Sequence, residues 1–268
     1  MKTLRYLAAA FLLMVFLASV GADFLSPAPY ERQFRDHPNE PPSRRFPLGT
    51  DELGRDRLSR LLHGSRVSLL LAPAAALLAV FLAALVGLSA GFLGGWFERA
   101  AMACTDLFVS LPWLFLLLTV RALLPLNVAP WTSVSITFLL LGLLGWASAA
   151  RVIRAGAAAV RGSDFALQAR AAGCRTARLM MVHLLPNLRP AIAAQFWISI
   201  PVFIWSEANL GMLGLGVTEP LPSWGNLLLE LANYRAVFAA PWLLAPAVLL
   251  VLVSSGFHFI FSKEDPCR

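Results

Sequence analysis

Charged residues are scarce in this sequence of 268 residues: 14% are Asp, Glu, Lys or Arg, whereas 58% are hydrophobic. Soluble domains usually carry charge on about a quarter of their residues. The deficit therefore excludes an ordinary water-soluble domain. It is concentrated in five long stretches that contain no charged residue, namely residues 6–22, 67–97, 122–150, 190–206 and 236–262.

These stretches are long enough to cross a membrane. A hydrocarbon core about 30 Å thick needs roughly 20 helical residues, and ~17 are still sufficient. A sixth apolar stretch, residues 107–120, qualifies if Asp106 and Arg121 at its two ends reach the membrane interfaces. The sequence therefore predicts an all-α polytopic membrane protein with about six transmembrane helices.

Lysine is almost absent, because Lys2 and Lys263 are the only two in the chain. Neither lies in a Gly-x-x-x-x-Gly-Lys loop, which excludes the usual phosphate-binding site of ATP-hydrolysing proteins. The three cysteines and four histidines are scattered without metal-binding or redox spacing. We therefore expect no catalytic, cofactor-binding or metal-binding residues in this chain.

The net charge of +7 does not indicate nucleic-acid binding, because many of the basic residues gather in one connection between apolar stretches. Residues 151–189 contain seven arginines and a single acid, Asp164. Connections rich in positive charge stay in the cytoplasm. Counting stretches in both directions from this loop places both termini in the cytoplasm, where Lys2, Arg5 and Lys263 fit the same rule.

The chain forms one domain with four parts. Residues 1–22 are the first transmembrane helix, retained as an uncleaved signal anchor. A cleaved signal peptide is the alternative, since basic residues precede the apolar run and small residues end it. Residues 23–66 form an extracytoplasmic loop. Residues 67–262 are a five-helix core that includes the cytoplasmic loop 151–189, and residues 263–268 are a cytoplasmic tail.

Two features indicate contact with the membrane interface. Thr50 or Asp51 can cap a short interfacial helix at the end of the extracytoplasmic loop, with an apolar side made of Leu53, Leu58, Leu61 and Leu62. Four tryptophans near the ends of predicted spans favour an aromatic belt: Trp131, Trp197, Trp224 and Trp242.

The cytoplasmic loop predicts a short helix, a turn and a second short helix. Ser163 is an N-cap residue, and Asp164 suits the positive start of a helix. Gly173 supplies a left-handed C-cap. The second helix should then run until Pro186 disrupts it. Such an ordered element between two spans is suited to docking on a soluble partner and transmitting force.

The same loop resembles the coupling loop of ABC importer permeases, whose pattern is Glu-Ala-Ala, three residues, Gly, nine residues, then Ile-x-Leu-Pro. Ala169, Gly173, Leu185 and Pro186 match this pattern with its spacing intact. The ending that includes His183 is similar to the oligopeptide and dipeptide branch of the family. Two further blocks, residues 48–69 and 207–226, resemble the same branch. The first of them contains Gly49, Thr50, Asp51, Gly54, Arg55 and Asp56.

This resemblance implies the type I ABC importer permease fold in a bacterial inner membrane. It implies a C-type permease of the peptide, nickel and opine branch that forms half of a translocation path. The implied partners, besides the lipid bilayer, are a second and unlike permease, two ATPase subunits that hold ATP and magnesium, and an extracytoplasmic solute-binding protein. The residues implied to engage the ATPase are Ser163, Asp164, Leu167, Gln168, Ala169, Arg170, Gly173, His183, Leu185 and Pro186.

The sequence departs from the family pattern at one place, because Leu167 and Gln168 stand where the family has Glu-Ala. In the family, that acidic residue helps the loop to engage the ATPase. Two interpretations follow: a divergent transporter with a matched ATPase, or a subunit with weakened coupling. The first is favoured, because the capping residues and the spacing are preserved.

Two acidic residues are candidates for a polar role in the bundle. Glu207, at the outer end of the fifth span, is interpreted as a gate or as a structural hydrogen-bonding group, since ionisable groups at membrane depth seldom face lipid. Asp106 has the same two interpretations and is expected at the cytoplasmic interface. A secondary transporter, which would show more intramembrane charges or two matching halves, and a purely structural membrane subunit are the alternatives.

Overall fold

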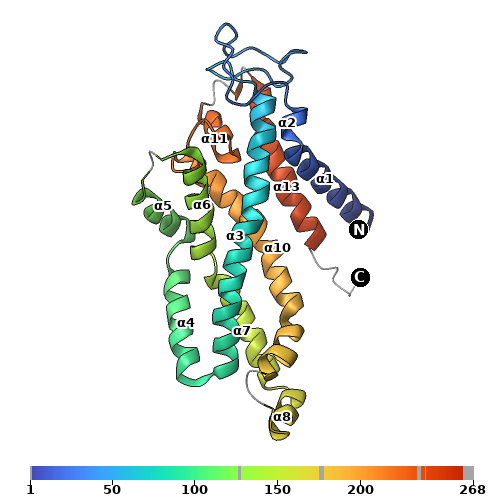
Figure 1. The fold of residues 1–268 in the computed structure, drawn as a ribbon, viewed down its shortest axis with the longest axis vertical. Coiled ribbons are helices and arrows are strands. Elements are labelled where there is room, and N and C mark those ends of the chain that lie inside the picture. Colours follow the sequence, from blue (N-terminus) through green and yellow to red (C-terminus); the bar gives the residue numbers. More distant parts are fainter. Residues whose placement is uncertain (1, 126–127, 175–177, 234–236, 239, 262–268) are drawn as a thin grey trace. The chain divides into compact units, whose positions relative to one another are not determined.

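The structure is a computed structural model that describes residues 2–125, 128–174, 178–233, 237–238 and 240–261. Within these residues every regular element is a helix, which confirms the predicted all-α class. The longer helices are α1 (Lys2–Val20), α3 (Arg57–Leu93), α4 (Gly95–Ser110), α5 (Trp113–Ala122), α6 (Pro130–Leu144), α7 (Ala147–Arg161), α8 (Asp164–Ala171), α10 (Leu185–Met212) and α13 (Ala245–Phe261) (Figure 1). The shorter ones are α2 (Ala22–Leu25), η1 (Leu179–Leu184), α11 (Trp224–Leu229), η2 (Glu230–Ala232) and η3 (Pro241–Leu244).

Five unbroken spans and one broken span agree with the predicted number of transmembrane helices. The unbroken ones are Thr3–Val20, Arg57–Leu93, Pro130–Arg161, Leu185–Met212 and Pro241–Phe261. The broken span consists of α4 and α5, which are bent by 82° relative to each other. Leu111, between them, has an extended backbone (φ −79°, ψ 131°), as expected for a residue that precedes a proline. The broken span therefore contains residues 107–120, the apolar stretch that was too short to cross the membrane without Asp106 and Arg121 at the interfaces.

α3 begins at Arg57, well before the predicted second span. Asp56 is its N-cap, because its Oδ2 accepts the backbone amide of Ser59 at 2.7 Å and the hydroxyl of the same residue at 2.6 Å. The prediction of a separate interfacial helix capped by Thr50 or Asp51 is wrong. From Arg57 the helix continues for 37 residues and passes through Pro73.

The chain divides into two compact units, of which the first comprises Met1–Pro73, Val120–Phe138 and Pro201–Arg268. In this unit α1 lies along α13, and α11 packs against α13 (Figure 1). Trp224 of α11 is fully buried, and its indole N–H donates to the hydroxyl of Ser65 at 2.9 Å. Trp224 therefore belongs to the core, and its assignment to an aromatic belt is wrong.

The second unit comprises Ala74–Thr119 and Leu139–Ile200, and in it α7 packs against both α3 and α4. α3 and α7 approach so closely that two glycines of α3 leave no room for a side chain. A methyl group at Gly87 would lie 2.6 Å from the carbonyl oxygen of Ala150, and one at Gly91 would lie 2.6 Å from Cβ of Ala157. Small residues of this kind let helix backbones meet in a bilayer, where packing rather than water exclusion holds helices together.

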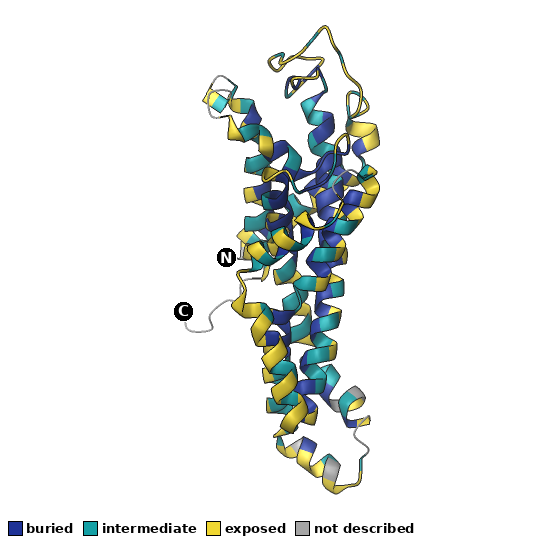
Figure 2. Ribbon diagram, turned by 90° about the vertical axis from the view of Figure 1, so that its left-hand side faces the viewer, coloured by how far each residue is buried: buried dark blue, intermediate teal, exposed yellow. Residues whose placement is uncertain are grey.

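Many residues along the helices are exposed (Figure 2). Large apolar side chains are numerous among these exposed residues. On α1 they include Leu7, Leu13, Met14 and Leu17. A surface of this kind is unfavourable in water and suits hydrocarbon, which needs no hydrogen-bonding groups. The exposed apolar faces therefore agree with the assignment of these helices as membrane spans.

The contact between α3 and α7 predicts that Gly87→Ala destabilises the protein. The added methyl group would force the two helices apart, and overpacking of this kind costs about 1–3 kcal/mol. We expect a lower midpoint of thermal unfolding for the purified protein in detergent. Gly162→Ala is the matched control, because its methyl group would meet no atom closer than 3.7 Å. Equal midpoints for the two variants would contradict the close approach.

Candidate functional site

The motif residues 49–56 fold the loop that precedes α3. Gly49 and Gly54 have φ values of +71° and +73°, a left-handed conformation that favours glycine. A side chain at either position would also overlap a backbone carbonyl of the same loop. The Thr50 hydroxyl bridges two backbone groups of residues 37–40, donating at 2.5 Å and accepting at 2.9 Å. These residues therefore have a structural role in shaping the loop.

Asp51 is the centre of this loop and is only 3% exposed. Its Oδ1 accepts the backbone amides of Leu53 and Arg55 at 2.9 and 2.8 Å. Its Oδ2 accepts Nε of Arg55 at 2.7 Å, and Nε of Arg60 lies 3.8 Å from the same oxygen. The carboxylate thus orients two arginine side chains in one direction.

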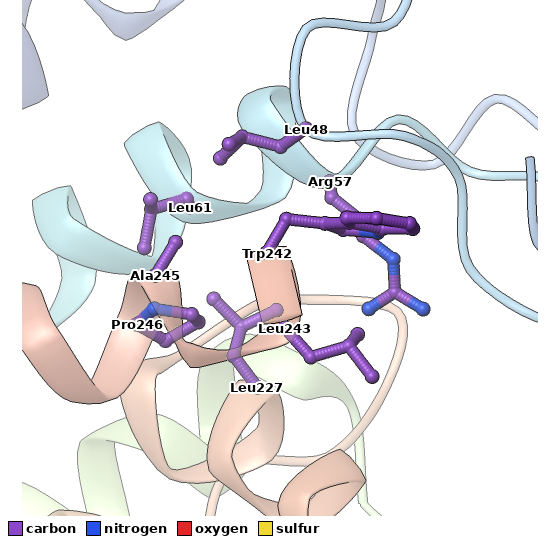
Figure 3. Close-up of a pocket in the computed structure, with 8 residues that line it drawn as sticks. All are labelled: Leu48, Arg57, Leu61, Leu227, Trp242, Leu243, Ala245 and Pro246. Atoms are coloured by element: carbon purple, nitrogen blue, oxygen red, sulfur yellow. The ribbon is translucent and has the colours of Figure 1, made fainter. Parts of the chain in front are cut away.

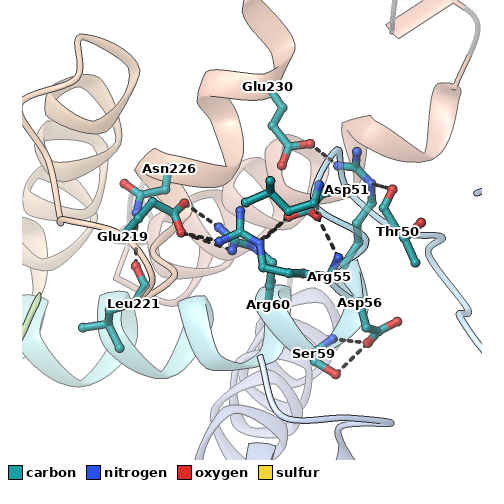
Figure 4. Close-up of polar contacts among 12 residues, drawn as sticks. Thr50, Asp51, Arg55, Asp56, Ser59, Arg60, Glu219, Leu221, Asn226 and Glu230 are labelled. Carbon is teal, nitrogen blue, oxygen red and sulfur yellow. Dashed lines mark hydrogen bonds and ion pairs between the residues drawn. The ribbon is translucent and has the colours of Figure 1, made fainter. Parts of the chain in front are cut away.

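Both arginines reach Glu219, which lies between α10 and α11 (Figure 4). Arg55 Nη1 is 2.7 Å from Oε2 of Glu219, and Arg60 Nη2 is 2.7 Å from Oε1. Nearby, Arg57 pairs with Glu230. We call this set the arginine–carboxylate cluster: Asp51, Arg55, Arg57, Arg60, Glu219 and Glu230. It fastens the loop before α3 to the segment that follows α10.

A small pocket lies beside the cluster (Figure 3). Its lining is apolar apart from one guanidinium and consists of Leu48, Arg57, Leu61, Leu227, Trp242, Leu243, Ala245 and Pro246. The guanidinium of Arg57 is already paired with Glu230. Because the lining has no acid, base or nucleophile, the pocket offers no catalytic chemistry.

The ion pairs of the cluster change the pKa values of its members. Burial by itself would raise the pKa of Glu219, but hydrogen bonds and charge from Arg60 and Arg55 outweigh it and lower the pKa below its ordinary value. Burial would likewise lower the pKa of Arg55, whereas Asp51 and Glu219 raise it overall. Glu219 and Arg55 are therefore held in their charged forms at neutral pH.

Glu207 lies near the end of α10 and is fully buried. The hydroxyl of Ser68 on α3 donates to its Oε2 at 3.2 Å, and its Oε1 faces Gly225 of α11. The structure thus places the carboxyl inside the helix bundle, as one of its two sequence-based interpretations expects. Its role as a gate stays a prediction.

Arg121 is also fully buried, at the end of α5. Its Nη2 donates to the hydroxyl of Ser133 at 3.0 Å. The turn after α5 and the loop after α10 enclose the guanidinium, so that Arg121 does not extend into solvent. Its position at a membrane interface stays a prediction. Sequence reasoning did not identify Arg121 as a site residue.

The coupling segment, residues 163–186, contains α8, which is buried on one side and exposed on the other. Ala166 is 2% exposed, and Ala169 packs on an apolar cluster made of Phe92, Ala157, Leu179, Leu184 and Leu188. Asp164, Leu167 and Gln168 are exposed. The residues that depart from the family pattern therefore lie on the accessible side of α8.

The predicted turn after α8 is present. Gly173 has a φ of +78°, and the amide of Cys174 donates to the carbonyl of Ala169 at 3.0 Å, one of the hydrogen bonds of a Schellman cap. Ser163 precedes α8 as predicted, but its hydroxyl donates back to the carbonyl of Val160 at 2.6 Å. The side chains of Arg170 and His183 lie outside the part of the chain that is described.

Pro186 does not end a helix, contrary to the prediction. Residues Leu179–Leu184 form a π-helical turn, η1, that continues directly into α10. The amide of Leu185 donates to the carbonyl of Met180, five residues earlier. Pro186 therefore lies just after the junction of η1 and α10, within a continuous helical segment.

Asp106 lies on α4 and is paired with Arg151 of α7, whose Nε is 3.0 Å from Oδ1. Glu98 of α4 pairs with Arg154 of α7. Both side chains of the Asp106–Arg151 pair are partly open to solvent. This exposure agrees with a position of Asp106 at a membrane interface, and the two ion pairs tie α4 to α7.

Comparison with known sequences decides the family. The family described as binding-protein-dependent transport system inner membrane component matches residues 69–263, most of the chain. The chain belongs to this family of permeases. The di/tripeptide transport permease DppC of Pseudomonas aeruginosa is 34% identical over 250 residues, which cover 91% of this chain and 80% of the relative.

Two permeases from Bacillus subtilis are similar over the same extent. The dipeptide transport permease DppC is 30% identical over 93% of this chain and 76% of its own length. The oligopeptide transport permease OppC is 28% identical over 93% of this chain and 79% of its own length. The protein is thus a multi-pass membrane permease of a bacterial ABC transporter.

In this permease the blocks that carry the family resemblance have separate structural roles. Residues 48–69 and 207–226 meet in the arginine–carboxylate cluster, whereas the coupling segment contains the capped helix α8. Sequence reasoning did not identify Glu219 as a partner of the first block, because ion pairing across 159 residues has no local signal. Arg121 did have a signal, since it is the only charged residue between 107 and 150.

Glu219→Gln tests the energetic contribution of the cluster. Because the pKa of Glu219 lies below its ordinary value of 4.5 in the folded chain, its ion pairs stabilise the fold above about pH 4.5. Their contribution is lost as the pH falls through the lowered pKa. We expect the variant to be less stable at pH 7.5, by ~1 kcal/mol because the Glu219 side chain is half exposed.

The measurement is the thermal midpoint of the purified permease in detergent at pH 7.5 and at pH 4. The difference between variant and parent should shrink at the lower pH. Glu52→Gln, an exposed carboxylate in the same loop, is the matched control and should have little effect at either pH. A deficit of Glu219→Gln that is the same at both pH values would show that the ion pairs are not its cause.

Proposed function

We propose that this permease forms half of the translocation path of an ATP-driven importer for peptides or similar small solutes. Its family and the names of its relatives, which are dipeptide and oligopeptide permeases, support this cargo class. ATP and magnesium would be bound by separate ATPase subunits, because neither Lys2 nor Lys263 lies in a phosphate-binding loop. The permease then contributes binding and gating, not hydrolysis.

The observation that carries the proposal is the two-sided environment of α8. One side is seated on an apolar cluster to which α3, α7, η1 and α10 each contribute. The other side presents Leu167, which is 51% exposed, and Gln168. A rigid helix with an open apolar residue fits the groove of a soluble partner, and its seat would pass any displacement to the spans.

The residues of the coupling segment have different parts in this proposal. Asp164, Leu167 and Gln168 would contact the ATPase, because they are exposed. Gly173 would hold the turn, and Leu185 and Pro186 would continue the segment into α10. Leu167 in place of an acidic residue would suit an ATPase whose groove is apolar at that point.

The remaining partners follow from the family. A second and unlike permease would complete the path, two ATPase subunits would drive it, and an extracytoplasmic solute-binding protein would deliver the cargo. Arg99 near the start of α4 and Arg161 at the end of α7 support a bacterial inner-membrane location with this end of the spans, and both termini, in the cytoplasm. The arginine–carboxylate cluster would then lie on the extracytoplasmic side.

Gly173→Pro tests the coupling role. Proline cannot adopt the φ of +78° found at this residue, so the turn after α8 must change. We expect the complete transporter, reconstituted in liposomes, to assemble and to hydrolyse ATP but to lose ATP-driven peptide uptake by at least tenfold. Uptake of a labelled peptide and phosphate release are measured in the same vesicles.

Gly95→Pro provides the control. Gly95 also has a left-handed backbone (φ +63°) with no atom near its side-chain position, but it is the first residue of α4 and lies outside the coupling segment. It should disturb the backbone similarly without uncoupling the two activities. Normal uptake by the Gly173→Pro transporter, or equal uncoupling by both variants, would contradict the coupling role.

A further inference from the structure

A fully buried arginine without a carboxylate partner stands apart from the other charges of the first unit. Arg55, Arg57 and Arg60 each pair with a carboxylate. Within the described residues, Arg121 has no such partner, and its contacts are all to neutral oxygens. The side chain is 0% exposed, so bulk solvent does not reach it.

The neutral contacts of Arg121 are few and mostly long. Nη2 is 3.0 Å from the hydroxyl of Ser133, an ordinary hydrogen bond. The carbonyl oxygen of Gly216 lies 3.5 Å from Nη2, and that of Pro125 lies 3.4 Å from Nη1, at the outer limit of hydrogen bonding. Nε has no acceptor. The guanidinium is therefore held loosely and incompletely.

A carboxylate would complete this site. Guanidinium and carboxylate form two parallel hydrogen bonds, and the side-on arrangement uses Nε together with one Nη. Nε of Arg121 is unoccupied, and the Gly216 carbonyl holds Nη2 only weakly. Removing a cation from water without supplying an anion is strongly unfavourable, which favours an anion that binds here during the working cycle.

The position of Arg121 suits an anion that arrives and leaves. It lies at the end of the broken span, next to the turn that contains Pro125, and Gly216 belongs to the loop between α10 and α11. In the proposed topology this is the extracytoplasmic end of the spans. A carboxylate from a partner subunit would have to stay inserted between these two connections throughout the working cycle. A carboxylate on the cargo would enter and leave with each molecule transported.

We propose that Arg121 binds the free carboxylate of a peptide cargo during translocation, so that the permease itself distinguishes peptides with a free carboxyl terminus from peptides whose carboxyl terminus is amidated. This inference rests on the proposed function as a peptide permease. In the enclosed state seen here, the Ser133 hydroxyl and the two carbonyl oxygens take the place of the cargo carboxylate.

The test compares trialanine with trialaninamide, which differ only in the charge of the carboxyl terminus. Initial rates of ATP-driven uptake are measured for the complete transporter in liposomes with its solute-binding protein. The ratio of the two rates is the readout, because the binding protein is the same for every variant. Arg121→Gln should lower this acid-to-amide ratio about tenfold, which corresponds to ~1.4 kcal/mol.

Two variants serve as controls. Arg121→Lys keeps the charge and should keep the preference for the acid. Arg99→Gln removes an exposed arginine elsewhere in the chain and should leave the ratio unchanged. If Arg121→Gln reduces uptake of both probes equally, or releases the second permease without changing the ratio, Arg121 is a structural or intersubunit residue and the inference is wrong.

A second measurement does not depend on the binding protein or on assembly of an active cycle. Millimolar trialanine should raise the thermal midpoint of the parent transporter in detergent, and trialaninamide should raise it less. Arg121→Gln should abolish the difference. A parent that responds equally to both probes would overturn the carboxylate site, whereas a parent that imports neither probe in liposomes would contradict the proposed peptide transport instead.

Discussion

A chain that crosses hydrocarbon has to satisfy its polar groups internally, because lipid supplies no hydrogen-bond partners. Several polar side chains on the spans follow this constraint. Ser199, Ser206 and Thr137 each donate to the carbonyl four residues earlier, at 2.8 to 3.0 Å. Such hydroxyls need no partner on another helix. A charged side chain cannot be satisfied by a single carbonyl of its own helix. The charged residues therefore lie where the chain departs from a simple bundle of straight helices.

Glu207 and Arg121 are the fully buried charges of the described spans that lack an ion pair, and each lies where the chain leaves a helix. Glu207 is near the end of α10 and faces α11, while Arg121 is at the end of α5. At these places carbonyls and hydroxyls that do not belong to a helix ladder are available as partners. By contrast, the charges of the arginine–carboxylate cluster and of the α4–α7 contact are paired with one another. The paired charges thus fasten elements to one another, whereas the two unpaired buried groups have no such role.

The features that depend on local chemistry were predictable from the sequence. Absence of charge located the spans, the pattern at Gly173 predicted a left-handed cap, and the proline after Leu111 accounts for the broken span. The prediction was wrong at Pro186 and at the start of α3, where the outcome depends on neighbours. The π turn before Pro186 keeps the helix continuous there, and the cap by Asp56 sets the start of α3. The partnership of Arg60 with Glu219 could not be predicted, since only the folded chain brings residues so far apart in sequence together.

The connection between the coupling segment and the buried carboxyl is a single helix. α10 begins within the coupling segment at Leu185 and carries Glu207 near its other end. A π turn in place of a proline break keeps this helix continuous with η1. π turns inside helices are frequent at functional positions and permit a local change of register. If α8 docks on an ATPase subunit as proposed, a displacement of α8 would reach α10 through η1, and α10 carries Glu207.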